Sequence, residues 1–410
     1  MSSQTTTLNG QTRSPPRQPS VLALIAVSML SPFATTVIVP AMPAIQSDYA
    51  TDYGTVQLIL SCFLASIAVA QILIGPLSDR FGRRPVLIAG LAVFVVSSIC
   101  AALAPTIESL IAIRIIQGAS GSTGIVLGRA IIRDLYERRK AASMIGYVTM
   151  GFAIAPMLAP LTGGLLQEAF DWTATFWFMA GFGIVCLAVA WVDIDETNLA
   201  RSKRIGFATL FGNFRDLIRS PDFLLFAACA SLTSAVFFSY LGGAPYISER
   251  LLGLSPKAYG LWFMAITGGY VVGNFLSGRY AERIGVAWMI IVGAALSAAA
   301  VTIMAGLFIK GYIVPASLFL PMCLAGIGNG LVLPSAIAGA ISIRPDMVGA
   351  ASGLVGTVQI GFGAAISAMS GMALSGSETG MPLIWVMVVS AFLALAIAFA
   401  IRAYCRQGVF

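Results

Sequence analysis

Few side chains in this sequence could do chemistry, and their types exclude most enzymes. The 410 residues include no histidine, and none of the 17 Asp and Glu residues lies near the middle of a long apolar stretch. None of the six cysteines stands at a spacing typical of a redox or metal site. The sequence also has no phosphate-binding glycine loop and no nucleophile–histidine pair. We therefore predict no enzymatic activity, no catalytic residue, no metal and no cofactor.

Arg114 is the only charged residue inside a long apolar stretch, and Gln117 follows it by about one helical turn. A charge near the centre of a bilayer costs about 2.5–3.5 kcal/mol on insertion scales, so we expect Arg114 to face the protein interior. Two interpretations remain open. Arg114 contacts substrate or senses a proton beside Gln117, or it braces the fold by bonding backbone carbonyl groups or by reaching back to Glu108.

Other polar or aromatic residues inside apolar stretches are candidates to line a substrate cavity. Amide side chains within a membrane need hydrogen-bond partners and therefore face the interior of the protein. Each candidate could equally form a simple bond between helices or fill space. The full candidate set is Thr36, Gln57, Arg114, Gln117, Tyr147, Phe237, Tyr240, Tyr270, Asn274, Asn329 and Gln359.

The apolar stretches that carry these residues are long enough to cross a membrane as helices. The sequence is 58% hydrophobic and 10% charged, whereas a soluble domain carries about 25% charged residues. We predict an all-α membrane protein with twelve transmembrane helices in two six-helix bundles. The predicted spans are 20–47, 53–78, 85–107, 109–128, 141–167, 172–192, 223–248, 258–278, 284–309, 311–343, 347–377 and 379–401.

Positive charges are sorted to one side of these spans. With twelve spans both termini lie on the same side, and 20 of the 24 Lys and Arg residues fall in the tails and loops of that side. The opposite loops hold three, and the remaining one is Arg114. Because Lys and Arg are enriched in cytoplasmic loops, we expect both termini in the cytoplasm and the chain in the plasma (inner) membrane. The net charge of +7 therefore reflects topology, and we predict no nucleic-acid partner.

The longest polar segment between spans divides the chain into two halves. We expect a monomer embedded in the lipid bilayer, with the following parts. They are a disordered cytoplasmic tail (1–19), an N-terminal six-helix bundle (20–192), a cytoplasmic linker (193–222), a C-terminal six-helix bundle (223–403) and a second cytoplasmic tail (404–410).

A charged hairpin after the second span is repeated in the second half. Residues 75–84 read GPLSDRFGRR, and residues 278–285 (GRYAERIG) align on residues 75–82 without a gap. Equal topology in the two halves implies a pseudo-two-fold axis along the membrane normal, with a site between the halves near the midplane.

The fifth predicted span carries small residues every fourth position. Gly151, Ala155, Ala159 and Gly163 form one smooth face for close helix contact. Prolines at 156 and 160 loosen the same helix. In the eleventh span, Gly349, Gly353, Thr357, Gly361 and Ala365 repeat the pattern. We expect surfaces that slide or seal between the halves, and ordinary tight packing is the alternative.

Residues 75–84 resemble the signature loop of the major facilitator superfamily. Residues 114–118 (RIIQG) are similar to a further element of that family, and residues 151–164 (GFAIAPMLAPLTGG) resemble its antiporter signature. The paired prolines point to the drug:proton antiporter branch, near the bicyclomycin- and chloramphenicol-resistance exporters. The antiporter element comprises Gly151, Ala155, Pro156, Ala159, Pro160, Gly163 and Gly164.

The resemblance implies a conformational latch in the hairpin. The Asp79 carboxylate would dock on the positive N-terminal end of span eleven in one state and release it in another. The alternative is a solvated turn that only anchors topology. The implied latch residues are Gly75, Asp79, Arg80, Gly82, Arg83, Arg84 and Asp134.

One position departs from the family pattern. Many such exporters carry an aspartate in span one, four residues before the first proline of a P-x-x-P element. Here that element is residues 40–43, and the matching position is Thr36. The departure weakens the expectation of proton coupling and of a preference for cationic drugs.

We predict a secondary active transporter that exports small, partly apolar compounds by proton antiport and alternating access. Its partners would be a small-molecule substrate and protons. One alternative is an importer of a metabolite on the same fold, since only the resemblance indicates export. A second alternative is a membrane receptor or scaffold that transports nothing.

Overall fold

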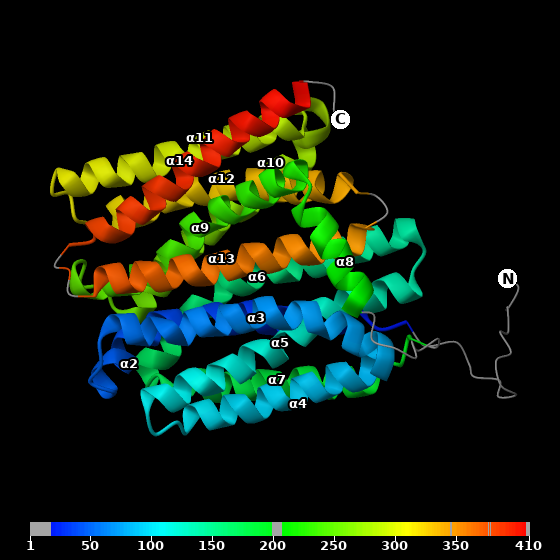
Figure 1. Ribbon diagram of the computed structural model, residues 1–410. Coiled ribbons are helices and arrows are strands. Elements are labelled where there is room, and N and C mark those ends of the chain that lie inside the picture. Colours follow the sequence, from blue (N-terminus) through cyan, green and yellow to red (C-terminus); the bar gives the residue numbers. More distant parts are fainter. Residues whose placement is uncertain (1–17, 199–206, 345–346, 376, 378, 407–410) are drawn as a thin grey trace, which may run out of the picture.

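The computed structural model of the chain describes residues 18–198, 207–344, 347–375, 377 and 379–406. These residues are almost entirely helical and include no β-strand. Long helices run side by side along one direction, with the first half of the chain on one side and the second half on the other (Figure 1).

The first half begins with an interrupted helix. The side chain of Ser20 accepts a hydrogen bond from the amide of Ala23 and so caps α1 (Val21–Thr36). The chain then passes through the 3₁₀ turn η1 (Val39–Ala41) into α2 (Met42–Asp48). Pro40 and Pro43 lack amide hydrogens, which explains why the helix does not continue regularly through them.

The remaining helices are long, apart from α8. Those of the first half are α3 (Tyr53–Phe81), α4 (Arg83–Ala102), α5 (Ile107–Leu135), α6 (Arg138–Ala169) and α7 (Thr173–Asp193). A short helix, α8 (Phe207–Ile218), stands between the halves. The second half holds α9 (Pro221–Arg250), α10 (Pro256–Ile284), α11 (Val286–Ile309), α12 (Pro315–Ser342), α13 (Val348–Leu374) and α14 (Met381–Arg406).

The prediction of an all-α membrane protein with twelve spans is confirmed. Ten spans among the described residues, with 21–48 counted as one, are long and apolar enough to cross a membrane. The other two long helices, α6 and α10, are less apolar along their length. These two pack against each other across the two halves, so each turns part of its surface away from lipid.

The two halves repeat the same packing. α3 packs on α5 and α4 on α7 in the first half, as α10 packs on α12 and α11 on α14 in the second. The hairpin glycines agree as well: Gly82 has φ 105° and ψ 151°, and Gly285 has φ 86° and ψ 150°. A positive φ at the same aligned position favours glycine in both copies and supports the predicted duplication.

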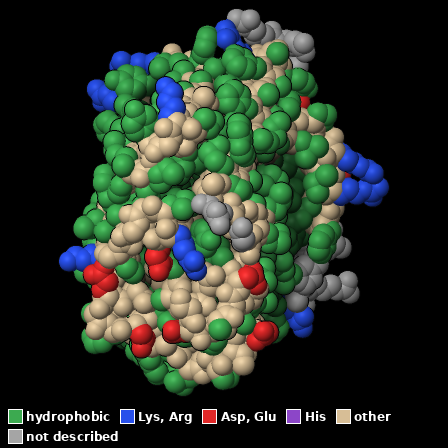
Figure 2. All heavy atoms as spheres, turned by 90° about the vertical axis from the view of Figure 1, so that its left-hand side faces the viewer, with side chains coloured by type: hydrophobic (Ala, Val, Ile, Leu, Met, Phe, Trp, Pro, Cys, Tyr) green, Lys and Arg blue, Asp and Glu red, His purple; other side chains and the backbone are tan. Residues whose placement is uncertain are grey.

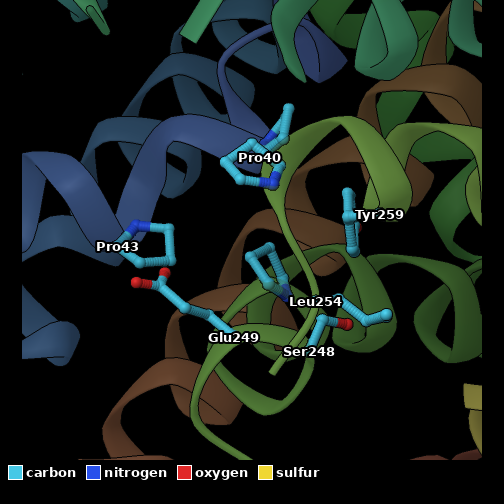
Figure 3. A pocket seen from close by; sticks show the side chains of 8 residues that line it. Pro40, Pro43, Ser248, Glu249, Leu254 and Tyr259 are labelled. Carbon is cyan, nitrogen blue, oxygen red and sulfur yellow. The ribbon is translucent and has the colours of Figure 1, made fainter. Parts of the chain in front are cut away.

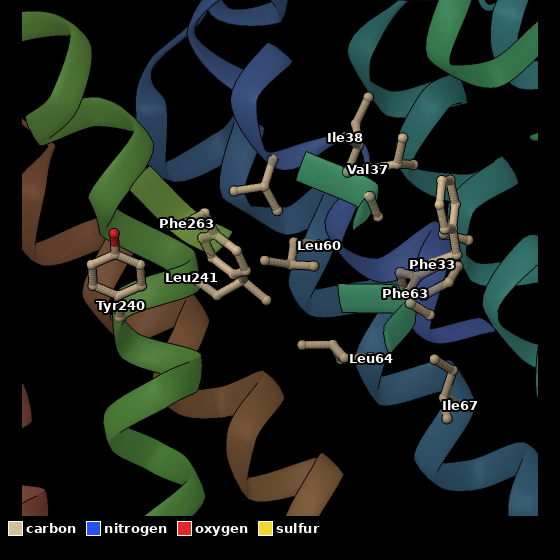
Figure 4. Close-up of a cluster of buried hydrophobic side chains, with 14 of the residues drawn as sticks. Phe33, Val37, Ile38, Leu60, Phe63, Leu64, Ile67, Tyr240, Leu241 and Phe263 are labelled. Atoms are coloured by element: carbon tan, nitrogen blue, oxygen red, sulfur yellow. The ribbon is translucent and has the colours of Figure 1, made fainter. Parts of the chain in front are cut away.

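The halves meet along two pairs of helices. α3 of the first half lies beside α13 of the second (Figure 1), and α6 packs against α10. Apolar side chains fill the space between, and the buried cluster includes Leu60 and Phe63 of α3 with Tyr240, Leu241 and Phe263 of the second half (Figure 4).

The bundle has two distinct ends. We call the end with the turns after α3 and α10 the hairpin end, and the other end the pocket end. α8 lies at the hairpin end (Figure 1). Figure 2 views the pocket end, where acidic side chains gather on the lower part, over the first half of the chain. That half contributes Asp48, Asp52, Glu108 and Asp171 there.

Candidate functional site

Arg83 joins two acidic residues at the hairpin end. Its Nη1 lies 2.5 Å from Asp79 Oδ1, and its Nε lies 3.1 Å from Asp134 Oδ2 at the end of α5. The same Nη1 donates to Ser78 Oγ at 2.5 Å. The structure thus brings together three of the predicted latch residues, with Asp79 bonded to Arg83 in this state.

Residues after α7 pack on the same hairpin, which the sequence did not indicate. Glu196 accepts a hydrogen bond from the Arg83 amide at 2.9 Å. Asn198 donates to the carbonyl oxygens of Ser78 at 3.3 Å and Asp79 at 2.9 Å. Short polar loops carry no periodic pattern, so this contact had no sequence signal.

The remaining latch candidates surround this contact. Arg84 donates to the Trp191 carbonyl oxygen at 2.7 Å and lies over its ring. The guanidinium of Arg80 is exposed and lies 5.2 Å from the ring of Phe81. Gly75 has room around it, since a Cβ there would meet no atom within 4 Å.

Arg114 and Gln117 form a buried pair inside the first half. Arg114 has 0% relative exposure, and its Nη1 donates to Gln117 Oε1 at 2.6 Å. Its other bonds reach the carbonyl oxygens of Ile59 and Ala34, each at 3.3 Å. The guanidinium also lies 3.8 Å from the centre of the Phe63 ring. Neither Arg114 nor Gln117 faces lipid.

These partners are those of a brace. Backbone carbonyls of α3 and α1 hold the guanidinium, and Gln117 Nε2 donates to Ser98 Oγ of α4 at 2.7 Å. The side chain is held inside the bundle and does not extend to Glu108. The role of Arg114 in substrate or proton sensing stays a prediction.

Several hydrogen bonds join the halves near the pocket end, including those from the Lys257 amide to Glu168 and from Ser375 Oγ to Asp52, and two come from within α3. Gln57 Nε2 donates to Ser367 Oγ of α13 at 2.6 Å, and Tyr53 Oη donates to the Gly242 carbonyl oxygen of α9 at 3.0 Å. Gln57 belongs to the predicted cavity set, whereas Tyr53 and Ser367 do not. Tyr53 lies at the edge of its span and Ser367 is one of many buried hydroxyls, so neither stood out in the sequence.

The glycines of α6 allow close contacts with both halves. A Cβ added to Gly163 would overlap the carbonyl oxygen of Val37, and one added to Gly164 would overlap that of Pro256 in α10. From the other side, a Cβ at Gly260 would lie 2.7 Å from the Pro160 oxygen. The α6–α10 contact therefore closes the pocket end.

The other α6 residues of the predicted element lie in the same helix. Ala155 and Ala159 are buried, and Pro156 is half-buried. The side-chain surroundings of Gly151 lie outside the described residues. In α13, two glycines of the predicted face lie toward the first half: a Cβ at Gly349 would be 3.8 Å from Arg133, and one at Gly361 would be 3.7 Å from Ala68, whereas Gly353 is open. The tightest contacts lie off that face, at Gly363 against Phe238 of α9 and at Gly371 against Gln57 of α3.

Three cavity candidates have their polar groups bonded within one half. Thr36 Oγ1 donates to the Pro32 carbonyl oxygen at 3.2 Å, and Asn274 Nδ2 donates to that of Tyr270 at 2.9 Å. Gln359 Nε2 donates to Ser234 Oγ at 2.7 Å. These are bonds between or within helices of one half, which the sequence left as an alternative to cavity lining.

The other candidates differ in exposure. Tyr147 is 50% exposed, and half-buried Phe237 packs on the ring of Phe263. Tyr240 and Asn329 are buried, and Tyr240 Oη and Asn329 Oδ1 have no hydrogen-bond partner among the residues that the structure describes. The structure does not gather the full set around one cavity.

A small pocket opens between the halves at the pocket end (Figure 3). It is lined from the first half by Pro40 and Pro43 and from the second by residues of α9, α10 and the turn between them. The residues from the second half are Pro245, Ser248, Glu249, Leu254, Pro256 and Tyr259. Among the described residues, no cluster of His, Cys, Asp or Glu could hold a metal ion.

Comparison with known proteins agrees with this architecture. The sequence profile of the Major Facilitator Superfamily matches residues 24–255. Multidrug resistance protein D of Escherichia coli is 29% identical over 92% of this chain and 95% of its own length. The bicyclomycin resistance protein homolog of Haemophilus influenzae is 26% identical over 90% of this chain and 92% of its own length. A chloramphenicol resistance protein of Pseudomonas aeruginosa is 29% identical over 80% of this chain and 75% of its own length.

Solved structures share the fold at low identity. A bacterial homolog of the human lysosomal transporter Spinster, in an inward-facing and occupied conformation, superposes with a TM-score of 0.72 at 18% identity. The superposition covers 93% of this chain and 96% of the Spinster homolog. The nucleoside transporter NupG superposes with a TM-score of 0.73 at 13% identity, and the match covers 93% of this chain and 99% of the NupG chain. The family profile, the relatives and the shared fold confirm the resemblance seen in the motifs, and the chain belongs to the major facilitator superfamily.

Proposed function

We propose that this chain is a secondary active transporter that exports small, partly apolar compounds from the cytoplasm. The observation that carries the proposal is the contact between two like-packed halves, closed at the pocket end by α6–α10 and by polar bonds from α3. Two halves around a shared site are the architecture of alternating access. The relatives named for resistance to bicyclomycin, chloramphenicol and multiple drugs support export over import.

We assign the hairpin end to the cytoplasm of a cell with an inner membrane. The arginines of the two hairpins lie at this end, as positive charges do on cytoplasmic faces. The pocket end, with its acidic loops, would then face outward. In the present state that end is closed, and its opening would release substrate to the outside.

The driving force that we propose is an inward proton gradient, with the protein acting as a monomer. The position at which many related exporters carry a membrane acid is Thr36, whose hydroxyl bonds within its own helix. The proton carrier must therefore be another residue. The hairpin bonds of Arg83 with Asp79 and Asp134 are suited to a latch, because partly exposed ion pairs are weak enough to break during a transport cycle.

An accumulation assay tests the proposal. The chain is expressed in a bacterium that lacks its main efflux pumps, and the uptake of chloramphenicol-like compounds and cationic dyes is measured with and without an uncoupler. We expect lower accumulation that the uncoupler restores. An Asp79→Asn variant, inserted to the same level, should lose this effect. Unchanged accumulation of every compound in cells with confirmed membrane insertion would remove the exporter and favour a receptor or scaffold.

A further inference from the structure

Residues 196–198, which follow α7, cap both helices of the first hairpin, and we call them the strap. Glu196 Oε1 accepts a hydrogen bond from the amide of Arg83, the first residue of α4, at 2.9 Å. Asn198 Nδ2 donates to the carbonyl oxygens of Ser78 and Asp79 in the last turn of α3, at 3.3 Å and 2.9 Å, respectively. The turn between the two helices is a single glycine, which has no side chain to cap α4. The strap therefore supplies, from a distant segment, partners for helix-end groups that have none within their own helices.

The middle residue of the strap bonds the latch acid of α5. Thr197 Oγ1 donates to Asp134 Oδ2 at 3.0 Å, and Arg83 Nε donates to the same oxygen at 3.1 Å. Arg83 also bonds Asp79 Oδ1 through its Nη1. The strap thus holds the backbone and the charges of the latch together across α3, α4 and α5. A guanidinium held in this way keeps the Asp79 carboxylate on its own half of the protein.

The strap is also held from within and from α7. The amide of Asn198 donates to Glu196 Oε1 at 2.9 Å, so the strap bends and both of these side chains reach the hairpin. Ile194, which follows α7 directly, is 1% exposed and anchors the start of the segment. Arg84 of α4 in turn donates to the carbonyl oxygen of Trp191 at 2.7 Å. The end of α7, the strap and the hairpin therefore form one hydrogen-bonded unit.

Asp79 is released from α13 in this structure. Its side chain is 52% exposed and pairs with Arg83, and among the described residues it makes no hydrogen bond to α13. In the first turn of α13, a Cβ placed on Gly349 would lie 3.8 Å from Arg133 Nη1. A guanidinium beside the positive end of a helix is unfavourable, whereas a carboxylate there is stabilised. This end of α13 is therefore suited to receive Asp79 when the hairpin lets it go.

We propose that the strap holds the latch open, an inference that rests on the proposed function and adds to it the residues that set the balance between its two conformations. By capping α3 and α4 and by sharing Asp134 with Arg83, the strap stabilises the state in which Asp79 is away from α13. Loss of the strap bonds leaves the hairpin free to turn Asp79 toward α13. The hairpin end then closes, the pocket end opens, and the outward-facing state gains population.

Distance measurements between spin labels at the two ends test the proposal. Lys140→Cys and Ser342→Cys form a pair across the halves at the hairpin end, and Ser47→Cys and Lys310→Cys form a pair across them at the pocket end. All four positions are exposed. Each pair is labelled in the full chain, in a background without the native cysteines and in lipid nanodiscs.

Two substitutions weaken the strap in different ways. Asn198→Ala removes both bonds to α3, and Thr197→Val removes the bond to Asp134 with little change in shape. In each variant we expect shorter distances to gain at the hairpin end and longer ones at the pocket end. The ratio of the two populations should change about two- to tenfold, as for the loss of one or two hydrogen bonds. Asn213→Ala in α8 is the matched control and should behave as the parent, because Asn213 forms no bond to the hairpin among the described residues.

An Asp79→Asn background separates control of the latch from a purely structural role. Asparagine has no charge to dock on α13, so Asn198→Ala should shift neither distance further in that background. Two results would overturn the proposal: unchanged distances in both folded strap variants, or equal shifts with and without Asp79. If Asn198→Ala fails to insert, Thr197→Val carries the same test, because it leaves both helix caps in place. If the chain exports nothing in the accumulation assay, the proposed function fails, whereas the distances still decide whether the strap controls the hairpin.

Discussion

Replacing Arg114 with methionine tests how the buried charge is held. Methionine is unbranched and apolar like the aliphatic part of arginine, but it is shorter, carries no charge and donates no hydrogen bond. The variant loses bonds to the carbonyls of Ile59 and Ala34 on two other helices and the bond to Gln117 Oε1. It also loses the contact of the guanidinium with the Phe63 ring at 3.8 Å.

The magnitude follows from these contacts. Bonds between helices in membranes are worth about 0.6 kcal/mol each, and a desolvated cation–π contact about 2 kcal/mol. Leaving Gln117 Oε1 without a partner costs about 1–3 kcal/mol. Against these losses, removing the buried charge recovers about 2.5–3.5 kcal/mol on insertion scales. We expect the free energy of unfolding to fall by about 1–3 kcal/mol.

Unfolding of the purified protein in bicelles measures this change, with export assayed in parallel across pH. Arg279→Met, at an exposed position near the end of α10, is the matched control and should leave stability unchanged within about 0.5 kcal/mol. A stable Arg114→Met variant with altered pH dependence of export would refute the bracing role and establish sensing. Unchanged stability and unchanged export together would show that the estimate of the contacts is wrong.

Three further predictions concern the seal, the latch and the cap of α3. Gly164→Val, whose Cβ would overlap the Pro256 carbonyl oxygen, should abolish export in protein that inserts normally, whereas Gly181→Val, with nothing within 4 Å, should not. A double-mutant cycle of Arg83→Gln with Asp134→Asn should give a coupling in stability below about 1 kcal/mol, because the pair is partly exposed, yet each variant should slow export in the accumulation assay. Hydrogen bonds from Thr55 lower the pKa of the Asp52 carboxyl group in the folded protein below its ordinary value. The ionised carboxylate therefore stabilises the fold fully at a pH above the ordinary pKa, and this stabilisation is lost as the pH falls through the lowered pKa of the folded state. Asp52→Asn should remove this acid-dependent loss from thermal unfolding curves.

The elements and their repeat could be predicted because membranes impose strong rules on sequence. Long apolar stretches located the twelve long helices, with ends that differ by up to seven residues: the predicted span 53–78 corresponds to α3 (Tyr53–Phe81), and 109–128 to α5 (Ile107–Leu135). The aligned hairpins were informative because Gly82 and Gly285 both require a positive φ. Such constraints are local, so a sequence expresses them directly.

Contacts between distant segments could not be predicted in the same way. Asn198 bonds to Asp79 across 119 residues, and Gln57 bonds to Ser367 across 310. A single asparagine or serine has no pattern that names its partner. The fourfold spacing in α13 indicated a face toward the first half, where Gly361 lies near Ala68, but it did not indicate the tightest contacts, which are made by Gly363 and Gly371.

The most direct test of the account locks the pocket end shut. Gln57→Cys and Ser367→Cys stand where Nε2 and Oγ lie 2.6 Å apart across the halves, in a background without the native cysteines. Each single-cysteine variant serves as the control. If the halves part at this end in every cycle, oxidation of the double variant stops export and a reductant restores it, while the single variants are unaffected. Export at the full rate by protein shown to be completely cross-linked would contradict alternating access between these halves.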